Sequence, residues 1–389
     1  MEWKEVDICQ LCDSVSETYK GNASEVVLIN TSDVLDGKCL NHEYVPNKKL
    51  KGQFKKTFRK GDILYSEIRP SNKRFCFVDF EPKDYIASTK LMVLRAHEDV
   101  DPQYLYQILR SNDTLAQLQM LAESRSGTFP QITYSELSNI MVSLPSQKAQ
   151  KNIVSILSSL DRKIELNNKI NADLEEMAQA IFKNWFVDFE PFKDGKFVDS
   201  ELGMIPEGWK VGRADDFYQI NIGKTPPRKE NKWFSTNPAD KIWVSIANMG
   251  NSGIFISDSS EYLTKEAVDR HNIIMVPRNT ILLSFKLTVG RVAIADKELT
   301  TNEAIARFIL SDDKYMEYLY LYLKNFDYNS LGSTSSIATA VNSKTIKGMQ
   351  MLQPSDKIID AFHIQVNPIF EKIRSLTKEN SRLSLLRDT

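Results

Sequence analysis

The sequence predicts a mixed α/β protein in which one unit is used twice and each unit ends in a long helix. Short apolar runs alternate with helical patterns, similar segments recur in the same order in both halves, and two long stretches carry heptad spacing. With 389 residues, 42% of them hydrophobic, the chain can bury two cores of ordinary size. We therefore expect two tandem, pseudo-symmetric globular domains, separated by two long antiparallel coiled-coil helices.

The globular regions combine predicted strands with predicted helices. Apolar runs of strand length occur at residues 26–29, 62–65 and 280–283. Amphipathic patterns typical of helices occur at residues 103–120 and 317–324. This alternation indicates an α/β class without defining a topology.

Four segments of the first half recur in the second half, in the same order and at nearly constant spacing. A single match of this quality is common by chance, but four in one order are hard to obtain without duplication. The matched pairs are 3–4 with 209–210, 60–66 with 278–284, 102–109 with 316–323, and 138–145 with 347–354.

The first long helix is expected to follow Pro145, with Ser146 as its N-cap. Residues 147–186 contain neither proline nor glycine. Roughly 40 residues at 1.5 Å each correspond to a rod of about 60 Å. Its seam positions follow heptad spacing: Ile153, Leu157, Leu160, Ile164, Asn167, Asn171, Leu174, Ala178 and Ile181.

The second long helix repeats this seam near the end of the chain. Pro368 is expected to kink or delay it. Asn171 and Asn380 occupy the same seam position of the two copies, where each amide either fixes the register or is simply tolerated. The second seam consists of Phe362, Val366, Ile369, Ile373, Leu376, Asn380 and Leu383. We predict that Ile153, Leu157, Leu160, Ile164 and Leu174 pack against Val366, Ile369, Ile373, Leu376 and Leu383.

These patterns divide the chain into five segments. Two are globular, two are helical and one is a linker. In order they are a first globular domain at 1–145, a central long helix at 146–188, a linker at 189–205, a second globular domain at 206–354 and a C-terminal long helix at 355–389.

Charge is balanced over the whole chain but segregated locally. Lys and Arg number 50, Asp and Glu 51, and the formal net charge is -1, so global charge indicates no partner. Residues 46–74, however, hold ten basic side chains against two acidic ones, and residues 270–291 hold four basic side chains and no acidic one. Such segments suit phosphate groups, and the alternative for each is a solvated charged surface.

Motifs for autonomous catalysis are missing from the sequence. It contains no G-x-G-x-x-G and no G-x-x-x-x-G-K-[ST] segment, and Asn237-Pro238-Ala239 departs from the Asn-Pro-Pro-aromatic loop of adenine methyltransferases. The four histidines are scattered, and no nucleophile lies in a local catalytic signature. We expect no catalytic residue on this chain.

The cysteines and the hydropathy pattern indicate a reducing compartment. Cys9 and Cys12 have metal-like spacing, and Cys39 and Cys76 could complete four ligands, but a second close pair is missing. We expect two buried thiols rather than zinc, and no metal. No apolar run approaches the length of a membrane helix, and Met1-Glu2-Trp3 does not begin a signal peptide, so we expect a cytoplasmic protein without membrane contact.

Two loops recur at equivalent places of the repeat. Residues 126–131 contain the turn formers Ser, Gly and Pro, and the serine-rich residues 333–337 lie at the corresponding position. These loops either approach DNA or a partner, or are plain connecting turns.

The chain resembles the specificity subunit of bacterial type I restriction-modification systems over essentially its whole length. The resemblance rests on the tandem repeat, on the heptad helix after each globular half, and on two segments. The segments are Ala180-Ile-Phe-Lys-Asn-Trp185-Phe-Val-Asp-Phe-Glu-Pro-Phe192 and Leu202-Gly-Met-Ile-Pro206-Glu-Gly-Trp209.

The resemblance implies two target recognition domains, each of which binds one half of a split sequence in double-stranded DNA, with the helices acting as a ruler. It further implies two modification subunits that supply S-adenosylmethionine and methylate adenine at N6. ATP-driven, Mg²⁺-dependent restriction and translocase subunits would complete the complex. The specificity chain itself would carry no cofactor.

Within this framework the basic segments become candidate phosphate contacts. The Trp185 and Phe186 pair either caps the coiled coil, which we favour, or docks a partner. Two other hypotheses are a coiled-coil scaffold without sequence-specific DNA binding and a self-contained nuclease or methyltransferase. The candidate DNA contacts are Lys55, Lys56, Arg59, Arg69, Lys73 and Arg74 in the first domain, and Lys224, Arg228, Lys229, Lys286 and Arg291 in the second.

Overall fold

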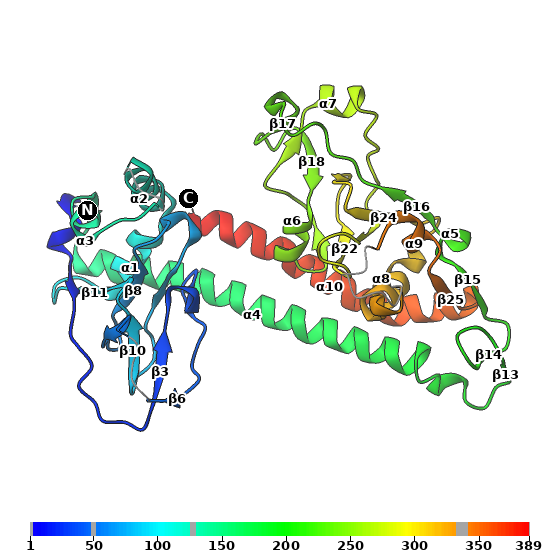
Figure 1. Ribbon diagram of the computed structural model, residues 1–389, viewed down its shortest axis with the longest axis horizontal. Helices are drawn as coiled ribbons and strands as arrows, with labels where there is room; N and C mark the ends of the chain where they lie inside the picture. The colour runs from blue at the N-terminus through cyan, green and yellow to red at the C-terminus, as the bar shows by residue number, and fades with distance from the viewer. Residues whose placement is uncertain (1–2, 48–51, 125–129, 332–340, 389) are drawn as a thin grey trace. The chain divides into compact units, whose positions relative to one another are not determined.

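The computed structural model describes residues 3–47, 52–124, 130–331 and 341–388 (Figure 1). Its chain forms two compact units. Unit 1 comprises Met1–Lys163 and Leu383–Thr389, and unit 2 comprises Ile164–Arg382. Each unit contains one globular half together with stretches of both long helices, whereas the sequence predicts the helices as separate segments.

Unit 1 is built on two four-stranded sheets. One has the strand order β2-β11-β8-β9 and is antiparallel; the other has the order β6-β3-β10-β7, with β3 and β10 parallel. A separate antiparallel pair, β1 with β12, joins the start of the domain to its end. The strands are β1 (Lys4–Asp7), β2 (Cys12–Val15), β3 (Glu25–Ile29), β4 (Val34–Leu35), β5 (Lys38–Cys39), β6 (Val45–Pro46), β7 (Phe54–Lys56), β8 (Ile63–Ser66), β9 (Phe75–Phe77), β10 (Tyr85–Ser88), β11 (Leu91–Ala96) and β12 (Met141–Leu144).

Three short helices complete unit 1: α1 (Pro102–Arg110), α2 (Asn112–Ser124) and α3 (Tyr134–Ser138). The helical pattern predicted over 103–120 is therefore two helices. The break lies at Ser111, whose backbone is extended and whose hydroxyl accepts a hydrogen bond from the Thr114 backbone N–H at 3.2 Å. A serine in this position favours a new helix start over continuation of the old helix.

Unit 2 repeats this design. A five-stranded sheet has the order β16-β24-β21-β22-β19, a four-stranded sheet has the order β17-β20-β18-β23, and β18 and β23 are parallel. The strands are β13 (Phe197–Val198), β14 (Ile205–Pro206), β15 (Lys210–Arg213), β16 (Gln219–Ile222), β17 (Phe234–Ser235), β18 (Lys241–Val244), β19 (Phe255–Ile256), β20 (Tyr262–Leu263), β21 (Ile281–Ser284), β22 (Val292–Ala295), β23 (Thr300–Thr301), β24 (Ile305–Ile309) and β25 (Gln350–Gln353). The short helices are α5 (Ala214–Phe217), α6 (Ile246–Asn251), α7 (Lys265–Arg270), α8 (Met316–Asn325) and α9 (Ser343–Lys347).

The sheet orders confirm the predicted mixed α/β duplication. The order β2-β11-β8-β9 of unit 1 recurs as β16-β24-β21-β22 of unit 2. The pair β1 with β12 recurs as β15 with β25, again antiparallel. Strands β8 and β21 begin and end at equivalent residues of the matched segments 60–66 and 278–284, so the sequence repeat is also a structural repeat.

The long helices are α4 (Gln147–Phe186) and α10 (Asp356–Asp388), with 40 and 33 residues. Pro368 lies inside α10, which begins at Asp356, so the expected delay of the helix is wrong and the expected kink stays a prediction. A proline leaves the carbonyl four residues earlier without its intrahelical donor. That residue is Ile364, which is 75% exposed.

The helices run antiparallel in unit 2, as predicted, but the register differs in detail. The Asn167 side-chain amide donates to Glu379 Oε2 and to Asn380 Oδ1, both at 2.8 Å, and Phe186 packs against Phe362. Asn380 therefore faces Asn167 and not its repeat equivalent Asn171, because equivalent positions of an antiparallel pair meet only at the pseudo-twofold centre.

Burial along the seam follows this register. Six predicted seam residues are buried: Asn167, Ala178, Phe362, Val366, Ile373 and Leu376. The other predicted seam residues are half-buried: Ile153, Leu157, Leu160, Ile164, Asn171, Leu174, Ile181, Ile369, Asn380 and Leu383. In unit 1, Arg387 contacts Asp161 at 3.1 Å, which continues the same register. The packing of Ile153 against α10 stays a prediction.

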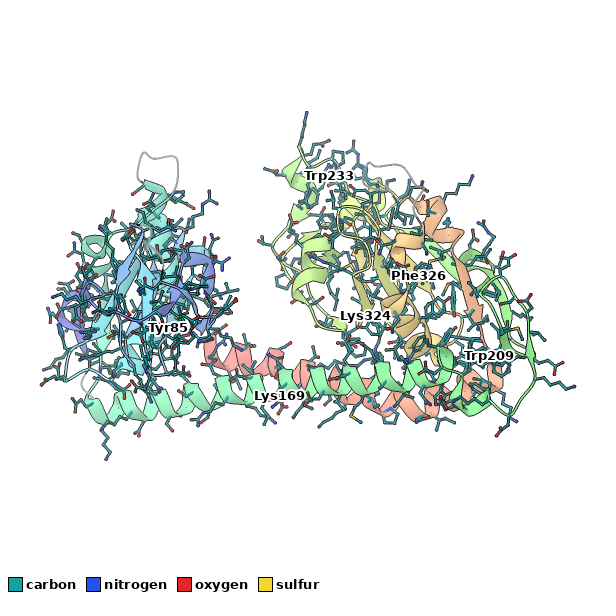
Figure 2. The ribbon with its side chains drawn as sticks, turned by 60° about the horizontal axis from the view of Figure 1, so that its bottom comes forward. Tyr85, Lys169, Trp209, Trp233, Lys324 and Phe326 are labelled. Atoms are coloured by element: carbon teal, nitrogen blue, oxygen red, sulfur yellow. The ribbon has the colours of Figure 1, made fainter. Side chains whose placement is uncertain are left out.

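Aromatic side chains join α4 to the core of unit 2. Phe182 and Phe186 pack against Tyr318 of α8 and Phe362 of α10, with ring centroids 4.8 to 6.3 Å apart. Phe186 is buried, and Trp185 is half-buried against Phe362. Both contacts with Phe362 of α10 agree with the interpretation that Trp185 and Phe186 cap the coiled coil. Figure 2 shows Trp209, which contacts Phe186, close to the helices.

A buried carboxylate connects α8 with α10. Glu317 is fully buried; its Oε1 accepts from the Asn367 amide at 2.9 Å and its Oε2 lies 2.8 Å from His363 Nδ1. Burial raises the pKa of the Glu317 carboxyl above its ordinary value of 4.5, although the hydrogen bonds from Asn367 and His363 act in the opposite direction. The folded chain thus holds this proton more tightly than the unfolded chain.

We expect Glu317→Gln to flatten the pH dependence of stability. A raised carboxyl pKa stabilises the fold fully below pH 4.5, and that stabilisation is lost as the pH rises through the folded pKa. The neutral amide removes this loss, so the variant should be more stable at neutral pH by about 1 kcal/mol. Urea unfolding between pH 4 and 8 measures the free energy of unfolding of the variant and of the wild type. An unchanged pH profile would contradict the assignment, and Glu201→Gln, at an exposed carboxylate between β13 and β14, is the control.

Candidate nucleic-acid interface

In unit 2 the fold brings several predicted basic residues to one place. The loop after β16 begins with Gly223, where a Cβ atom would meet Asn302 O at 1.9 Å, so only glycine allows the loop to approach β23 this closely. Lys224 follows, with its backbone N–H bonded to Thr301 O at 2.8 Å and its Nζ donating to His271 O at 2.6 Å. The loop is thereby fixed on both sides.

Glu303 organises the charges around this loop. The Thr225 hydroxyl donates to its carboxylate. Burial alone would raise the pKa of Glu303, but the Thr225 hydrogen bond and the nearby Lys286 and Arg228 charges lower it below its ordinary value. We call Lys224, Thr225, Arg228, Lys286 and Glu303 the unit 2 cluster.

The predicted basic residues of unit 2 differ in exposure and in the contacts that their side chains make. Arg228 forms a bidentate pair with Glu261, at 2.7 and 3.0 Å, and stacks over Phe234 and Trp243 at 4.1 and 4.5 Å. Lys229 and Lys286 are exposed. Arg291 is half-buried and donates to Ile246 O at 2.8 Å, so it braces α6 from within.

An aromatic side chain supports the outer end of unit 2. Trp233 is buried, with His271 packed edge-on at 4.9 Å and the Lys232 and Arg270 cations within 4.3 and 5.4 Å of its ring. Figure 2 shows Trp233 at the end of unit 2 away from the long helices. Because Lys224 is bonded to His271, the cluster is held by this packing.

Unit 1 has a corresponding cluster around the loop between β8 and β9. Lys90 Nζ lies 3.4 Å from Glu67 Oε2 and 3.4 Å from Gln131 Oε1, and Lys56 Nζ donates to Leu91 O at 2.8 Å. Burial lowers the pKa of Lys56. Arg69 is exposed, and its backbone N–H bonds to Pro130 O at 3.1 Å. We call Lys56, Glu67, Arg69, Lys90 and Gln131 the unit 1 cluster.

The remaining basic candidates of unit 1 are dispersed. Lys55 and Arg59 are exposed. Arg74 is half-buried and donates to Ser32 O at 3.0 Å and Val34 O at 3.4 Å, so it holds a turn, as Arg291 holds α6 in unit 2. Residues 48–51, which include three of the predicted basic side chains, lie outside the described residues, as do 125–129 and 332–340 from the two predicted loops.

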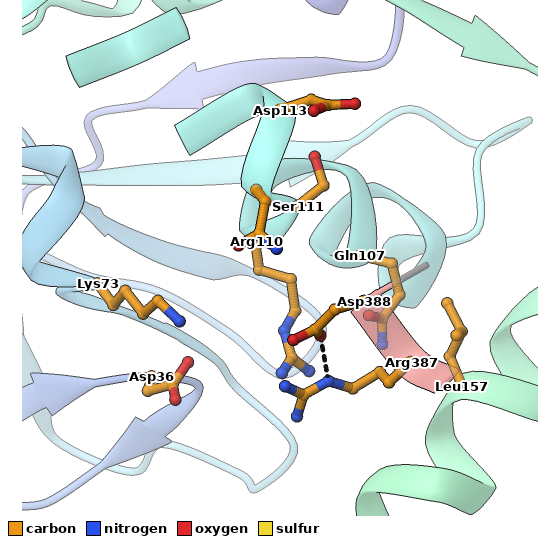
Figure 3. Close-up of a pocket in the computed structure, with 10 residues that line it drawn as sticks. Asp36, Lys73, Gln107, Arg110, Ser111, Asp113, Leu157, Arg387 and Asp388 are labelled. Atoms are coloured by element: carbon orange, nitrogen blue, oxygen red, sulfur yellow. Dashed lines mark hydrogen bonds and ion pairs between the residues drawn. The ribbon is translucent and has the colours of Figure 1, made fainter. Parts of the chain in front are cut away.

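Lys73 lines a cavity of about 270 Å³ within unit 1 (Figure 3). Both signs of charge line this cavity. Arg110 and Arg387 share Asp161, with N to O distances of 2.8 and 3.1 Å, and Arg387 also donates to Asp388 at 2.8 Å. These pairs attach the end of α10 to α1 and α4 within unit 1.

Among the described residues, no group of three His, Cys, Asp or Glu side chains is arranged to hold a metal ion. Burial raises the pKa of the Cys12 thiol to about 12, and such a thiol stays protonated and is a poor zinc ligand. No helix in the described part of the chain is long and apolar enough to cross a membrane.

Sequence reasoning identified Lys56, Arg69, Lys224 and Lys286 but missed their neighbours. Lys90, Gln131 and Glu303 join the clusters only through strand pairing and loop contacts, which no local pattern reports. The apex residue of the β21–β22 loop, Leu287, was also missed. Extending the matched segments 60–66 and 278–284 by three residues would have aligned it with Arg69.

The fold and its clusters define a class of protein: a duplicated α/β chain with a basic loop region on each copy and an antiparallel helix pair. Comparison with known proteins agrees with this class. The family model described as "Type I restriction modification DNA specificity domain" matches residues 2–176 and 206–363. The chain belongs to this family.

Individual relatives cover nearly the whole chain. The specificity subunit of the type I restriction enzyme HindI from Haemophilus influenzae is 34% identical, with 100% of this chain and 97% of that protein aligned. The MjaIX specificity subunit from Methanocaldococcus jannaschii is 28% identical over 90% of this chain and 82% of that protein. The crystal structure of a type I restriction-modification S subunit from M. genitalium shares the fold, with a TM-score of 0.54 at 14% identity, covering 100% of this chain and 94% of that chain.

Proposed function

We propose that this chain is the DNA specificity subunit of a type I restriction-modification complex and that each globular half binds one half of a split target. The observation that carries the proposal is the repeated sheet order with different side chains on equivalent loops. A shared framework places the loops alike, and different loops select different bases. The 34% identity to a specificity subunit supports the proposal.

In this proposal the exposed cations of the two clusters contact phosphates of double-stranded DNA. Lys90 does so in unit 1, and Lys224 and Lys286 do so in unit 2, with Lys55, Arg59 and Lys229 nearby in the sequence. Phosphate contacts position the protein on the duplex and release counterions. Arg228, Arg74 and Arg291 are engaged within the protein and serve to shape the loops.

Catalysis belongs to partner subunits in this proposal. Two modification subunits would supply S-adenosylmethionine and adenine methylation, and restriction subunits would supply ATP-driven, Mg²⁺-dependent translocation and cleavage. The long helices offer exposed apolar side chains for such partners: Leu166 and Met177 on α4 are 53% and 54% exposed, and Ile364 on α10 is 75% exposed. The complex would act in the cytoplasm, where it meets cellular DNA.

The proposal predicts a salt-dependent loss on charge reversal. In the complex with its modification partner, Lys229→Glu combined with Lys286→Glu should lower affinity for target DNA. It should also reduce the slope of log affinity against log salt by about two, one per phosphate contact. Fluorescence anisotropy at several salt concentrations measures both.

The matched control reverses Lys196 and Lys210, two exposed lysines of the same unit that lie next to β13 and in β15. It should leave affinity and slope unchanged. Equal losses in both double variants would show that only overall charge matters. No sequence preference in the wild-type complex would favour a scaffold without specific DNA binding.

A further inference from the structure

The loop between β21 and β22 holds an apolar side chain in a strained and exposed position. Leu287 has a φ of +61° and is 99% exposed. The Thr288 backbone N–H bonds to Lys286 O at 2.7 Å, closing a three-residue turn with Leu287 at its apex. A turn of this kind with positive φ is rare and unfavourable for a leucine. Nothing in the described part of the chain covers the leucine side chain in return.

The rest of this loop is firmly held. The Ser284 hydroxyl donates to Thr288 O at 2.6 Å and accepts from the Arg291 backbone N–H at 3.0 Å, and the Gly290 backbone N–H bonds to Ser284 O at 3.0 Å. The Arg291 side chain anchors the base of the loop to Ile246 O. The loop is therefore preorganised and presents Leu287 outward. Packing of the leucine side chain does not compensate the backbone strain, and uncompensated strain of this kind is typical of functional sites.

Unit 1 has an exposed side chain at the equivalent place. Counting from the last residue of β8 and of β21, Ser66 and Ser284, the third residue onward is Arg69 in one unit and Leu287 in the other. Arg69 also has a positive φ, +46°, and is exposed. Both loops close with the same bond, from Ser66 N–H to Arg74 O at 2.8 Å and from Ser284 N–H to Arg291 O at 2.9 Å.

The surroundings of Leu287 favour DNA over an apolar protein partner. Lys286 precedes it and belongs to the unit 2 cluster, and the exposed lysine flanks the leucine with positive charge. A single apolar side chain among cations suits a duplex, where phosphates meet the lysine and the bases meet the leucine. Apolar side chains contact bases either at the thymine methyl group or as wedges in a base step.

We propose that the loop-apex positions 287 and 69 determine base specificity in the second and first half-sites, Leu287 by apolar contact with a base and Arg69 by contact with a base edge. This inference rests on the proposed function. The two units would thus use one backbone device with different side chains, so that each half-site is chosen by its own apex residue.

The test uses the full chain in complex with its modification partner. Leu287→Gly removes the side chain and relieves the positive φ, and Leu287→Arg gives unit 2 the apex of unit 1. Leu202→Gly, in the β13–β14 turn of the same unit and 46% exposed, is the control. The readouts are thermal unfolding, affinity for target DNA and the sequence motif of methylated sites.

We expect Leu287→Gly to keep or raise the unfolding temperature, to lower affinity about tenfold, and to relax one or two adjacent positions of one half-site only. Leu287→Arg should change the preferred base at those positions. Replacing thymine by deoxyuridine weakens wild-type binding if the contact is to the methyl group. 2-Aminopurine fluorescence rises if the leucine opens a base step.

Three results would overturn the inference. An unchanged motif and affinity in Leu287→Gly would show that the apex does not contact bases. A uniform loss of affinity with the motif intact would assign it to positioning, and a lower unfolding temperature would assign it to the fold. A wild-type complex that methylates without a split motif would overturn the proposed function itself, which separates the two failures.

Discussion

Asp296→Ala is expected to lower the free energy of unfolding by about 3 kcal/mol, because it removes the buried carboxylate that pairs with the buried Arg374 guanidinium and leaves Glu371, 50% exposed, as the remaining carboxylate. Asp296 and Arg374 have side chains that are 2% and 4% exposed, and they pair at 3.2 Å. Lys378 Nζ lies 3.2 Å from the same carboxylate and Arg278 Nε 3.5 Å from it. The carboxylate thus faces three cations from α10 and from the β21 side of the sheet.

Arg374 is held by more than this charge pair. Its Nη2 donates to Asn279 Oδ1 at 2.7 Å, and its guanidinium lies 4.4 Å from the centre of the Phe255 ring. The Nε contact with Asp296 is an ion pair without the geometry of a hydrogen bond. Removing the Asp296 carboxylate therefore leaves the guanidinium packed in place, with Glu371 Oε1 at 3.0 Å from its Nη1 as the remaining counter-charge.

Urea denaturation of the full chain measures this effect. Lys378→Ala is the control, because its side chain is 49% exposed and an exposed partner contributes less than about 1 kcal/mol. A loss below 1 kcal/mol for Asp296→Ala would show that the network is dispensable. The network would then not be what attaches α10 to the globular half of unit 2.

Exchange of residues 1–145 for the same region of another specificity subunit is expected to change one half-site and leave the other intact. Each unit has its own buried cores, and β1 pairs with β12 inside the exchanged region. Each mismatched base pair costs about 1–3 kcal/mol, so three altered positions would lower affinity for the original target by several orders of magnitude.

The junction after residue 145 crosses contacts that the exchange must preserve. The Gln150 side chain of α4 accepts from the Asp101 backbone N–H at 2.9 Å and donates to Pro145 O at 3.0 Å. A second exchange that continues to residue 163, the end of the first stretch of unit 1, keeps these contacts within one parent. Loss of specificity at both half-sites in both exchanges would contradict independent domains.

Local sequence patterns predicted the parts of the fold that local chemistry determines. The apolar runs at 62–65 and 280–283 correspond to β8 and β21, and the proline-free heptad stretch corresponds to α4. The pattern at 103–120 predicted one helix where the structure has two, because a serine cap interrupts an otherwise continuous amphipathic signal. The delay expected from Pro368 is wrong, because α10 already begins at Asp356, twelve residues earlier.

The candidate site was only partly predictable, because composition treats all basic residues alike. Arg74 and Arg291 bind backbone carbonyls, whereas Lys286 is exposed at a cluster, and only tertiary contacts distinguish them. The Asp296 to Arg374 pair joins residues far apart in the sequence, so no spacing rule finds it. Leu287 is uncharged, so a search for basic segments does not find it, although the repeat alignment places it opposite Arg69.

Sequencing of methylated adenines in DNA from cells that co-express this chain with its modification partner tests the central claim most directly. The account predicts one split motif, with two specified half-sites and a constant unspecified spacer. A contiguous motif, or methylation without any motif in a complex that has formed, would contradict two independent DNA-binding halves.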